Sequence, residues 1–203
     1  ILLALRERDR TGAGQLVEVN LLQSLLSALT NQASSTLATG TAPRRMGNQH
    51  PSIAPYAVFR AADRELVIAV GNEKQFRALA DVLGAPELAD DERFRGNADR
   101  VAHRVALHDA IEQALAGASA AHWVDALTRV GVPSGLVNDV AEAIAFADAL
   151  GLEPVASAPD PQSPHGPHRS MSNPIGLSAS PPDYRTAPPA LGEHDGADWL
   201  PRA

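Results

Sequence analysis

Hydrophobic positions along this chain change between helical and strand spacing, and the changes predict its elements. An apolar-then-charged pattern over residues 1–10 predicts the end of a helix, and the partly β-branched residues 16–20 predict a strand. A helix from about residue 21 to residue 38, ending at Gly40, is predicted by five leucines at helical spacing: Leu21, Leu22, Leu25, Leu26 and Leu29.

Two strands and a series of capped helices are predicted next. Residues 57–60 and 66–70 predict strands around a turn at 62–64, and Asn72 is a favourable N-cap with Gln75 at the capping-box position. The later elements are a helical turn at 86–88, a helix over about 100–115, a helix capped by Ser119, a strand over 132–137 and a helix capped by Asp139.

The apolar faces of these elements predict one core. We expect these side chains to be inward: Phe59, Val67, Ile68, Phe76, Leu79, Leu83, Leu107, Ile111, Trp123, Leu127 and Val130. Five prolines between residues 154 and 168 predict a partly extended linker. The pattern therefore predicts a compact α+β unit from about residue 50 to 150, flanked by segments that belong elsewhere.

The amino-acid composition excludes several classes of chemistry and of binding partner. The chain has 203 residues, 44% of them hydrophobic, which is enough to bury a core without crosslinks. The absence of Cys excludes disulfides, thiol nucleophiles and Cys-based metal sites, and the net charge of −7 argues against nucleic-acid binding. No run approaches the ~18–20 apolar residues of a membrane span, and no signal peptide is recognised. Because Ile1 opens inside a helical pattern without an initiator Met, we expect a piece of a longer protein.

Common catalytic patterns are missing. There is no phosphate-binding glycine loop and no Gly-x-Ser-x-Gly elbow. His103 and His108 are five residues apart, so they do not share a helix face, and we expect both to be exposed polar side chains of a helix. His165 and His168 lie in the proline-rich linker without nearby carboxylates, so no metal site is expected.

The loop at residues 44–51 is the most suggestive stretch. Its adjacent arginines suit phosphate or carboxylate groups, and Gly47 allows close approach of the backbone to a ligand. Asn48, Gln49 and His50 add hydrogen-bond donors and acceptors on a loop, where sites usually lie. The alternative is a solvated connector between two lobes.

Several blocks of the chain, in order, resemble a known family. Residues 12–19 (GAGQLVEV) and 45–56 (RMGNQHPSIAPY) are similar to two of its signature segments. Further matching blocks are 67–76 (VIAVGNEKQF), 131–135 (GVPSG), 173–175 (NPI) and 188–194 (PPALGEH). The family is the class III CoA-transferases, also called the CaiB/BaiF or carnitine-dehydratase-like family.

The resemblance implies a mixed α/β fold and a chain of about twice this length. In that family a large Rossmann-like domain is built from both ends of the chain, a small α+β domain lies between, and two ring-like subunits interlock as a homodimer. This sequence is similar to the C-terminal half. Residues 1–40 would be part of the large domain, residues 41–153 the small domain with its leading loop, and residues 154–203 the linker and return to the large domain.

The family chemistry moves CoA between carboxylic acids through a mixed anhydride and an aspartyl-CoA thioester. The resemblance places the nucleophilic Asp in the preceding half, so it implies no catalytic residue here and an inactive chain on its own. It implies a substrate-binding loop at Gly47, Asn48, Gln49 and His50, with one glycine where well-studied members have several. The partners would be acyl-CoA and a carboxylic acid, with CoA as substrate rather than cofactor, no metal, no nucleic acid and no membrane, in the cytoplasm.

Two alternatives stay open at the level of sequence. The same resemblance includes racemases of 2-methylacyl-CoA, whose acid–base residues would also lie in the preceding half. The other alternative is a non-catalytic half that dimerises or binds a partner.

Overall fold

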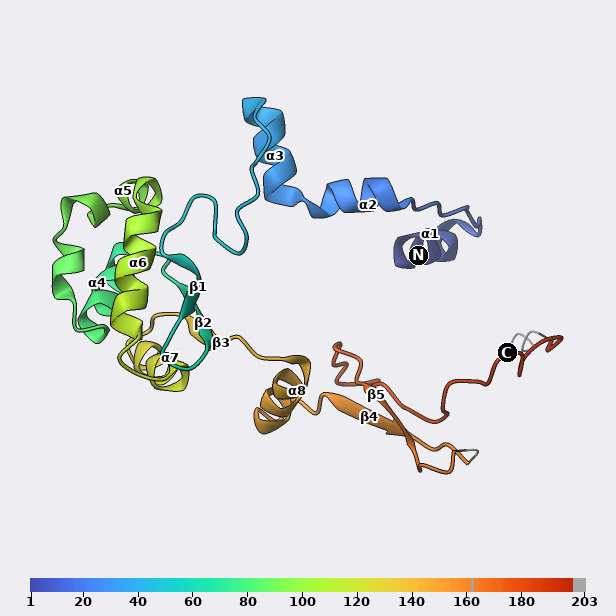
Figure 1. Cartoon of the computed structure of the whole chain (residues 1–203). Coiled ribbons are helices and arrows are strands. Elements are labelled where there is room, and N and C mark those ends of the chain that lie inside the picture. The colour runs from blue at the N-terminus through green and yellow to red at the C-terminus, as the bar shows by residue number, and fades with distance from the viewer. Residues whose placement is uncertain (162, 199–203) are drawn as a thin grey trace.

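The chain forms a central body from which two arms extend (Figure 1). The computed structural model spans residues 1–203, and the structure describes residues 1–161 and 163–198. A three-stranded sheet and helices α4 to α7 make the body, while α1–α3 and the segment from α8 onward extend from it toward the same side in Figure 1.

The sheet has the order β1-β2-β3 and is antiparallel throughout. β1 (Tyr56–Arg60) pairs with β2 (Glu65–Ala69), and β3 (Ser134–Leu136) pairs with the other side of β2. Successive side chains of a strand point to opposite faces. Leu66 and Ile68 are therefore fully buried, while Val67 lies on the other face and is half-buried, so its predicted inward position was wrong.

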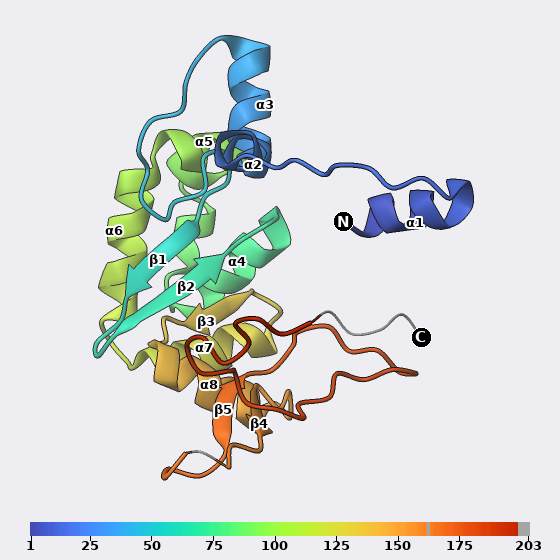
Figure 2. The ribbon, with the colours of Figure 1, turned by 90° about the vertical axis from the view of Figure 1, so that its right-hand side faces the viewer.

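Helices pack against this sheet, as Figures 1 and 2 show. They are α4 (Glu73–Val82), the 3₁₀ turns η1 (Pro86–Ala89) and η2 (Glu92–Phe94), α5 (Asn97–Ala102), α6 (Arg104–Leu115) and α7 (Ala120–Arg129). The helix predicted over 100–115 is divided, because His103 leaves helical geometry with φ −108° and ψ 26°.

The predicted caps of the body's helices are confirmed in part. Asn72 accepts a hydrogen bond from the Gln75 N–H at 3.0 Å, and Ser119 accepts one from the His122 N–H at 3.3 Å. The Gln75 side chain does not complete a capping box. Its Oε1 accepts from the Gly71 N–H at 2.7 Å, and its Nε2 donates to the Gly131 carbonyl at 3.1 Å.

The core of the body runs from Ala54 to Val132. Of the predicted core, nine residues are buried: Phe59, Ile68, Phe76, Leu79, Leu83, Leu107, Ile111, Trp123 and Leu127. Val130 is 46% exposed, because it follows the last residue of α7 and leaves the buried face. The prediction for Val130 was therefore wrong.

The N-terminal arm consists of α1 (Leu2–Thr11), α2 (Leu21–Ala28) and α3 (Thr30–Thr39), none of which has a buried residue. The helix predicted to run to residue 38 is broken at Thr30, whose φ is 31°. The predicted strand at 16–20 is wrong, because these residues pair with no strand in the described part of the chain.

The C-terminal arm begins with α8 (Val140–Ala149), which Asp139 caps in a capping box with Glu142. Arg64 in the β1–β2 turn forms an ion pair with Glu142 at 2.7 Å and also donates to the Val137 carbonyl. The Arg64 guanidinium, together with the Asp139 N–H, lowers the pKa of Glu142 to about 2. This ion pair attaches α8 to the sheet.

A hairpin replaces the predicted linker. β4 (Val155–Ala158) pairs antiparallel with β5 (His168–Met171), in the register Ala156↔Ser170. The prolines at 154, 159, 161, 164 and 167 lie just outside the two strands, where no ladder hydrogen bond is needed from them. The linker interpretation was therefore wrong for 155–158 and 168.

In the described residues no helix is long and apolar enough to cross a bilayer.

Candidate functional site

The candidate site loop leads from α3 into β1 and follows the outer edge of that strand. Gly47 has a φ of +63°, a conformation that glycine adopts without steric cost, and the Gln49 N–H donates to the Met46 carbonyl at 3.3 Å. These features turn the chain back so that the residues after Gly47 lie beside β1.

Asn48 and His50 contact the edge of β1 directly. The Asn48 Oδ1 accepts a hydrogen bond from the Val58 N–H at 3.3 Å, and the His50 N–H donates to the Tyr56 carbonyl at 3.0 Å. The His50 ring stacks on Tyr56 with centroids 5.2 Å apart. Its Nδ1 accepts from the Ser52 N–H at 3.2 Å, so a neutral imidazole carries its proton on Nε2. The structure thus gives two predicted site residues local partners on the strand edge.

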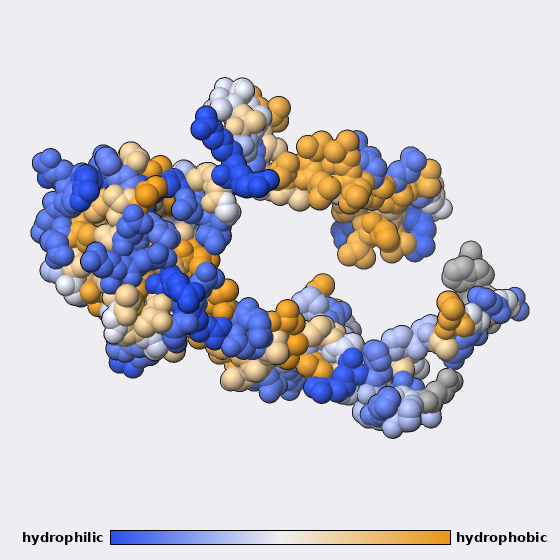
Figure 3. Space-filling model, in the orientation of Figure 1, coloured by the Kyte–Doolittle hydropathy of each residue, from blue (hydrophilic) through white to orange (hydrophobic). Residues whose placement is uncertain are grey.

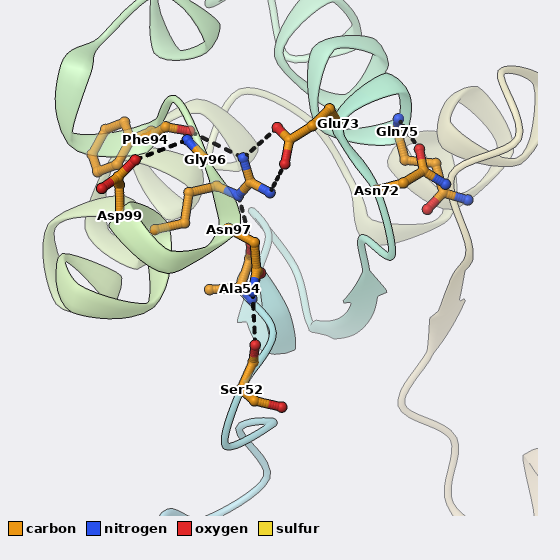
Figure 4. A network of polar contacts seen from close by, with 10 residues as sticks. Ser52, Ala54, Asn72, Glu73, Gln75, Phe94, Gly96, Asn97 and Asp99 are labelled. Atoms are coloured by element: carbon orange, nitrogen blue, oxygen red, sulfur yellow. Dashed lines mark hydrogen bonds and ion pairs between the residues drawn. The ribbon is translucent and has the colours of Figure 1, made fainter.

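Helices α5 and α6 hold the same loop from the other side. Arg104 donates from Nη1 to the His50 carbonyl at 3.1 Å and from Nη2 to the Pro51 carbonyl at 3.0 Å. It also reaches the Gln49 Oε1 at 3.4 Å. Asn97 binds the next part of the loop. Its side chain donates to the Ser52 carbonyl at 2.8 Å and accepts from the Ala54 N–H at 3.2 Å (Figure 4).

Arg100 anchors the end of the loop inside the body. It is 1% exposed, and its Nε donates to the Ala54 carbonyl at 2.7 Å. Its other nitrogens bond the Phe94 carbonyl at 3.0 Å and both Glu73 oxygens at 2.8 and 2.9 Å, partners that can be followed in Figure 4. Its guanidinium lies 4.4 Å from the centre of the Phe76 ring. Hydrogen bonding to Arg100 lowers the pKa of Glu73 below its usual range.

Two hollows adjoin the loop. One, of about 20 Å³, lies under it among Gln49, Tyr56 and Arg104, and has room for about one water molecule. The other, of about 570 Å³, lies between α3 and the loop, where Asn31, Gln32 and Ser35 of α3 are among the lining residues with His50 and Ser52. A volume of that size suits a small organic ligand.

The structure brings the four predicted site residues together on one loop, but they do not face one hollow. His50 lines the larger space, Gln49 lines the smaller one, and Gly47 and Asn48 line neither. In residues 1–161 and 163–198, no group of three or more His, Asp or Glu side chains is arranged to hold a metal ion.

The helix residues that hold the loop were missed from sequence. The prediction that the His108 side chain is an exposed polar group of a helix is wrong: its ring stacks on Phe59 with centroids 4.6 Å apart, and its Nε2 lies 3.2 Å from the Val58 carbonyl. The available signal was a polar repeat at helical spacing beside the apolar one. The polar positions are Asn97, Arg100, Arg104, His108 and Glu112.

Comparison with known proteins identifies the family. Residues 1–195 match the family model described as CoA-transferase family III, and the chain belongs to that family. It is 49% identical over 140 residues to an acetyl-CoA:oxalate CoA-transferase of Acetobacter aceti. The aligned region covers 69% of this chain and 36% of that protein. It is 37% identical over 195 residues to a succinate–glutarate CoA-transferase of Agrobacterium fabrum, covering 94% of this chain and 47% of that protein.

Solved structures agree with this assignment. A CaiB/BaiF family protein from Brucella suis is 37% identical and superposes with a TM-score of 0.78, over 97% of this chain and 50% of that one. Rv3272 from Mycobacterium tuberculosis, at 22% identity, shares the fold with a TM-score of 0.81, over 97% of this chain and 51% of that one. The mixed α/β structure therefore corresponds to half of a CaiB/BaiF family fold. The chain spans about half the length of relatives such as the Agrobacterium protein.

Proposed function

We propose that this chain is the C-terminal half of an acyl-CoA:carboxylate CoA-transferase. The observation that carries the proposal is a match over 94% of this chain to 47% of a relative named as a succinate–glutarate CoA-transferase. The relatives' names favour transfer over racemisation of 2-methylacyl-CoA and over a non-catalytic half. In this proposal residues 1–40 and 154–203 join the preceding half in a large domain, residues 41–153 form the small domain, and the enzyme is a homodimer.

The reaction needs a carboxylate nucleophile, which we assign to an aspartate in the preceding half. Its oxygen attacks the acyl-CoA carbonyl and displaces CoA as thiolate, which leaves a mixed anhydride. The thiolate then attacks the aspartyl carbonyl, and the donor acid leaves as its carboxylate. The acceptor carboxylate attacks the resulting aspartyl-CoA, and the same steps in reverse order yield the new acyl-CoA and regenerate the aspartate.

The site loop would stabilise the negative oxygen that develops in each of these steps. Asn48 uses its Oδ1 on the Val58 N–H, which leaves its Nδ2 to donate to a ligand. His50 uses its Nδ1 on the Ser52 N–H, so its Nε2–H is the remaining donor of the neutral ring. Both side chains are already oriented by the strand edge, which reduces the ordering cost of such donors in the transition state.

The test compares the 203-residue chain with a longer chain that includes the preceding half. We expect no CoA exchange from the short chain, and turnover from the longer chain or from the two halves mixed. In the longer chain, Asn48→Ala and His50→Ala should lower kcat by about 10²-fold, the effect of losing one oxyanion donor. CoA binding should change much less, because the loop would face the acyl end. Exchange is followed by mass spectrometry with a panel of acyl-CoA thioesters.

Gln113→Ala is the matched control, because Gln113 is an exposed amide on α6 away from the loop. Its kcat should equal that of the unmodified protein. Robust exchange by the 203-residue chain alone would contradict the assignment of the nucleophile. Full activity in both loop variants would remove the loop from the mechanism.

A further inference from the structure

A polar stripe along α5 and α6 binds the backbone of the site loop and of β1. We define the polar stripe as Asn97, Arg100, Arg104, His108 and Glu112, which follow one another at intervals of three, four, four and four residues. Residues at this spacing share one face across successive helical turns. All five form hydrogen bonds to main-chain groups between His50 and Arg60.

The polar stripe supplies hydrogen-bond partners to the outer edge of β1, where a further strand would otherwise be needed. β1 is an edge strand, and the unpaired N–H and C=O groups of such an edge require partners. His108 Nε2 lies 3.2 Å from the Val58 carbonyl, and Glu112 Oε1 accepts from the Arg60 N–H at 2.8 Å. Asn48 completes this edge from the loop side by accepting from the Val58 N–H. The outer edge of β1 is therefore shared between α6 and the site loop.

Arg104 has a particular place in the stripe, because it bonds three consecutive residues of the loop. Its two terminal nitrogens bond the carbonyls of His50 and Pro51 separately, and Nη1 also contacts the Gln49 side chain. A planar guanidinium supplies several donors in a fixed fork, whereas a lysine ammonium is a single point charge on a flexible stem. The main chain that carries the His50 ring is thus set by Arg104.

We propose that Arg104 is a positioning residue for CoA transfer, which fixes the loop at Gln49–Pro51 so that His50 and Asn48 present their donors to the reacting acyl group. This inference rests on the proposed function. Asn97 and Arg100 hold the following residues, Ser52 and Ala54, through the contacts given above. Rearrangement of the loop during turnover is then confined to residues before Asn48, whose Oδ1 is held by the Val58 N–H.

The experiment uses the longer chain that contains these residues, with Arg104→Gln and Arg104→Lys variants. Hydrogen exchange of peptides covering residues 47–55 reports the loop directly, because the N–H groups of His50, Ser52 and Ala54 are hydrogen-bonded in the ordered loop. We expect Arg104→Gln to accelerate that exchange and to lower kcat at least about tenfold, as loss of charge-assisted hydrogen bonds implies, with KM for acyl-CoA changed less than about twofold. Arg104→Lys should restore part of both losses, since an ammonium can still bond one of the carbonyls.

Arg129→Gln is the control, because Arg129 is an exposed arginine of α7 whose partner is Asp125 on the same helix. It should leave both the loop exchange and kcat unchanged. If Arg104→Gln does not fold, Arg104→Lys carries the same comparison. Unchanged loop exchange in the Arg104 variants would overturn the inference, and so would faster exchange with unchanged kcat.

The two proposals fail in different ways. An unmodified longer chain without CoA exchange would contradict the proposed function, whatever the Arg104 variants do. In that case the hydrogen-exchange result alone would still decide whether Arg104 orders the loop: faster exchange supports that part of the inference, and unchanged exchange overturns it.

Discussion

At the scale of single residues, the burial of Arg100 is the feature with the largest consequences. Among the residues that the structure describes, Arg100 is the only charged or polar one whose side chain is buried. A charge in that position is tolerated only when it is paired and hydrogen-bonded, and Arg100 meets this condition through Glu73 and two main-chain carbonyls. Because these partners lie on the loop, on α4 and on η2, one side chain connects three segments.

At the scale of residues, a contact could be predicted when its two partners are close in sequence, and not when they are far apart. The caps at Asn72, Ser119 and Asp139 were predictable, because each depends on a hydrogen bond to a residue three positions away. Arg100 bonds residues 46 and 27 positions away, and no local rule indicates that pairing. The four residues of the candidate site loop were placed together by family resemblance, whereas the helix side chains that hold the loop were not found.

We predict that Glu73→Gln destabilises the body at neutral pH and weakens its dependence on acid. Arg100 lowers the pKa of Glu73 in the folded state, so the folded protein binds fewer protons there than the unfolded chain. This stabilisation is present above the usual pKa of glutamate and is lost as pH falls through the lowered value. Since the Glu73 side chain is 55% exposed, we expect a loss of only about 1–2 kcal/mol after solvent screening.

The measurement is a urea titration at neutral pH and again in acid, below the usual range of a glutamate. Glu87→Gln, an exposed position on η1, is the control and should stay within about 0.5 kcal/mol. Equal stability of Glu73→Gln and the unmodified chain at neutral pH would show that Arg100 finds sufficient partners without Glu73.

At the scale of elements, α7 shows how a helix is fixed to the body by one large side chain. Trp123 is 8% exposed, and its Nε1 donates to the Leu115 carbonyl at 2.8 Å. That carbonyl is at the C-terminal end of α6, where carbonyls have no partner within their own helix. Trp123 thus contributes both buried area and a hydrogen bond between consecutive helices.

Helices were predictable where hydrophobic residues recur at one helical spacing. They were not predictable where the backbone changes conformation while that spacing continues. α4 and α7 follow one apolar stripe and were placed within a few residues. The breaks at Thr30 and His103 lie inside continuous helical patterns, and β4 and β5 lie among prolines that conceal a hairpin. In each case, the hydrophobic period gives no sign of the change in backbone conformation.

We predict that Trp123→Ala costs about 3–5 kcal/mol of unfolding free energy, as truncation of a buried Trp does. Trp123→Phe keeps most of the apolar volume but removes the indole donor, so the Leu115 carbonyl keeps only the longer 3.3 Å bond from the Ala118 N–H, and the cost should be only about 1–3 kcal/mol. Denaturant titration of both variants separates packing from hydrogen bonding. A loss below about 1 kcal/mol for Trp123→Ala would be inconsistent with the burial of this side chain.

At the scale of the whole molecule, the arms differ from the body in how much apolar surface they expose. Figure 3 shows hydrophobic residues gathered over α1 and α2. Leu21 and Leu22 are 76% and 68% exposed, and Leu25 and Leu26 are 56% and 51% exposed. A contiguous apolar surface of this kind is typical of an interaction site. The family assignment was predictable from ordered sequence blocks, and the change of pattern outside residues 50–150 already indicated that the flanking segments lie apart from the body.

We predict that the 203-residue chain, prepared alone, does not stay a monomer. Each leucine left exposed on α2 forgoes roughly 1.5–3 kcal/mol of burial, so association that covers this face is favoured. Light scattering should therefore show a mass above 21.3 kDa, increasing with concentration. Leu22→Gln combined with Leu26→Gln should shift the population toward the monomer, while Ser27→Gln, on the same helix and already polar, should not. A monodisperse particle of monomer mass from the unmodified chain would contradict this prediction, because it would show that the exposed leucines of α2 do not drive association.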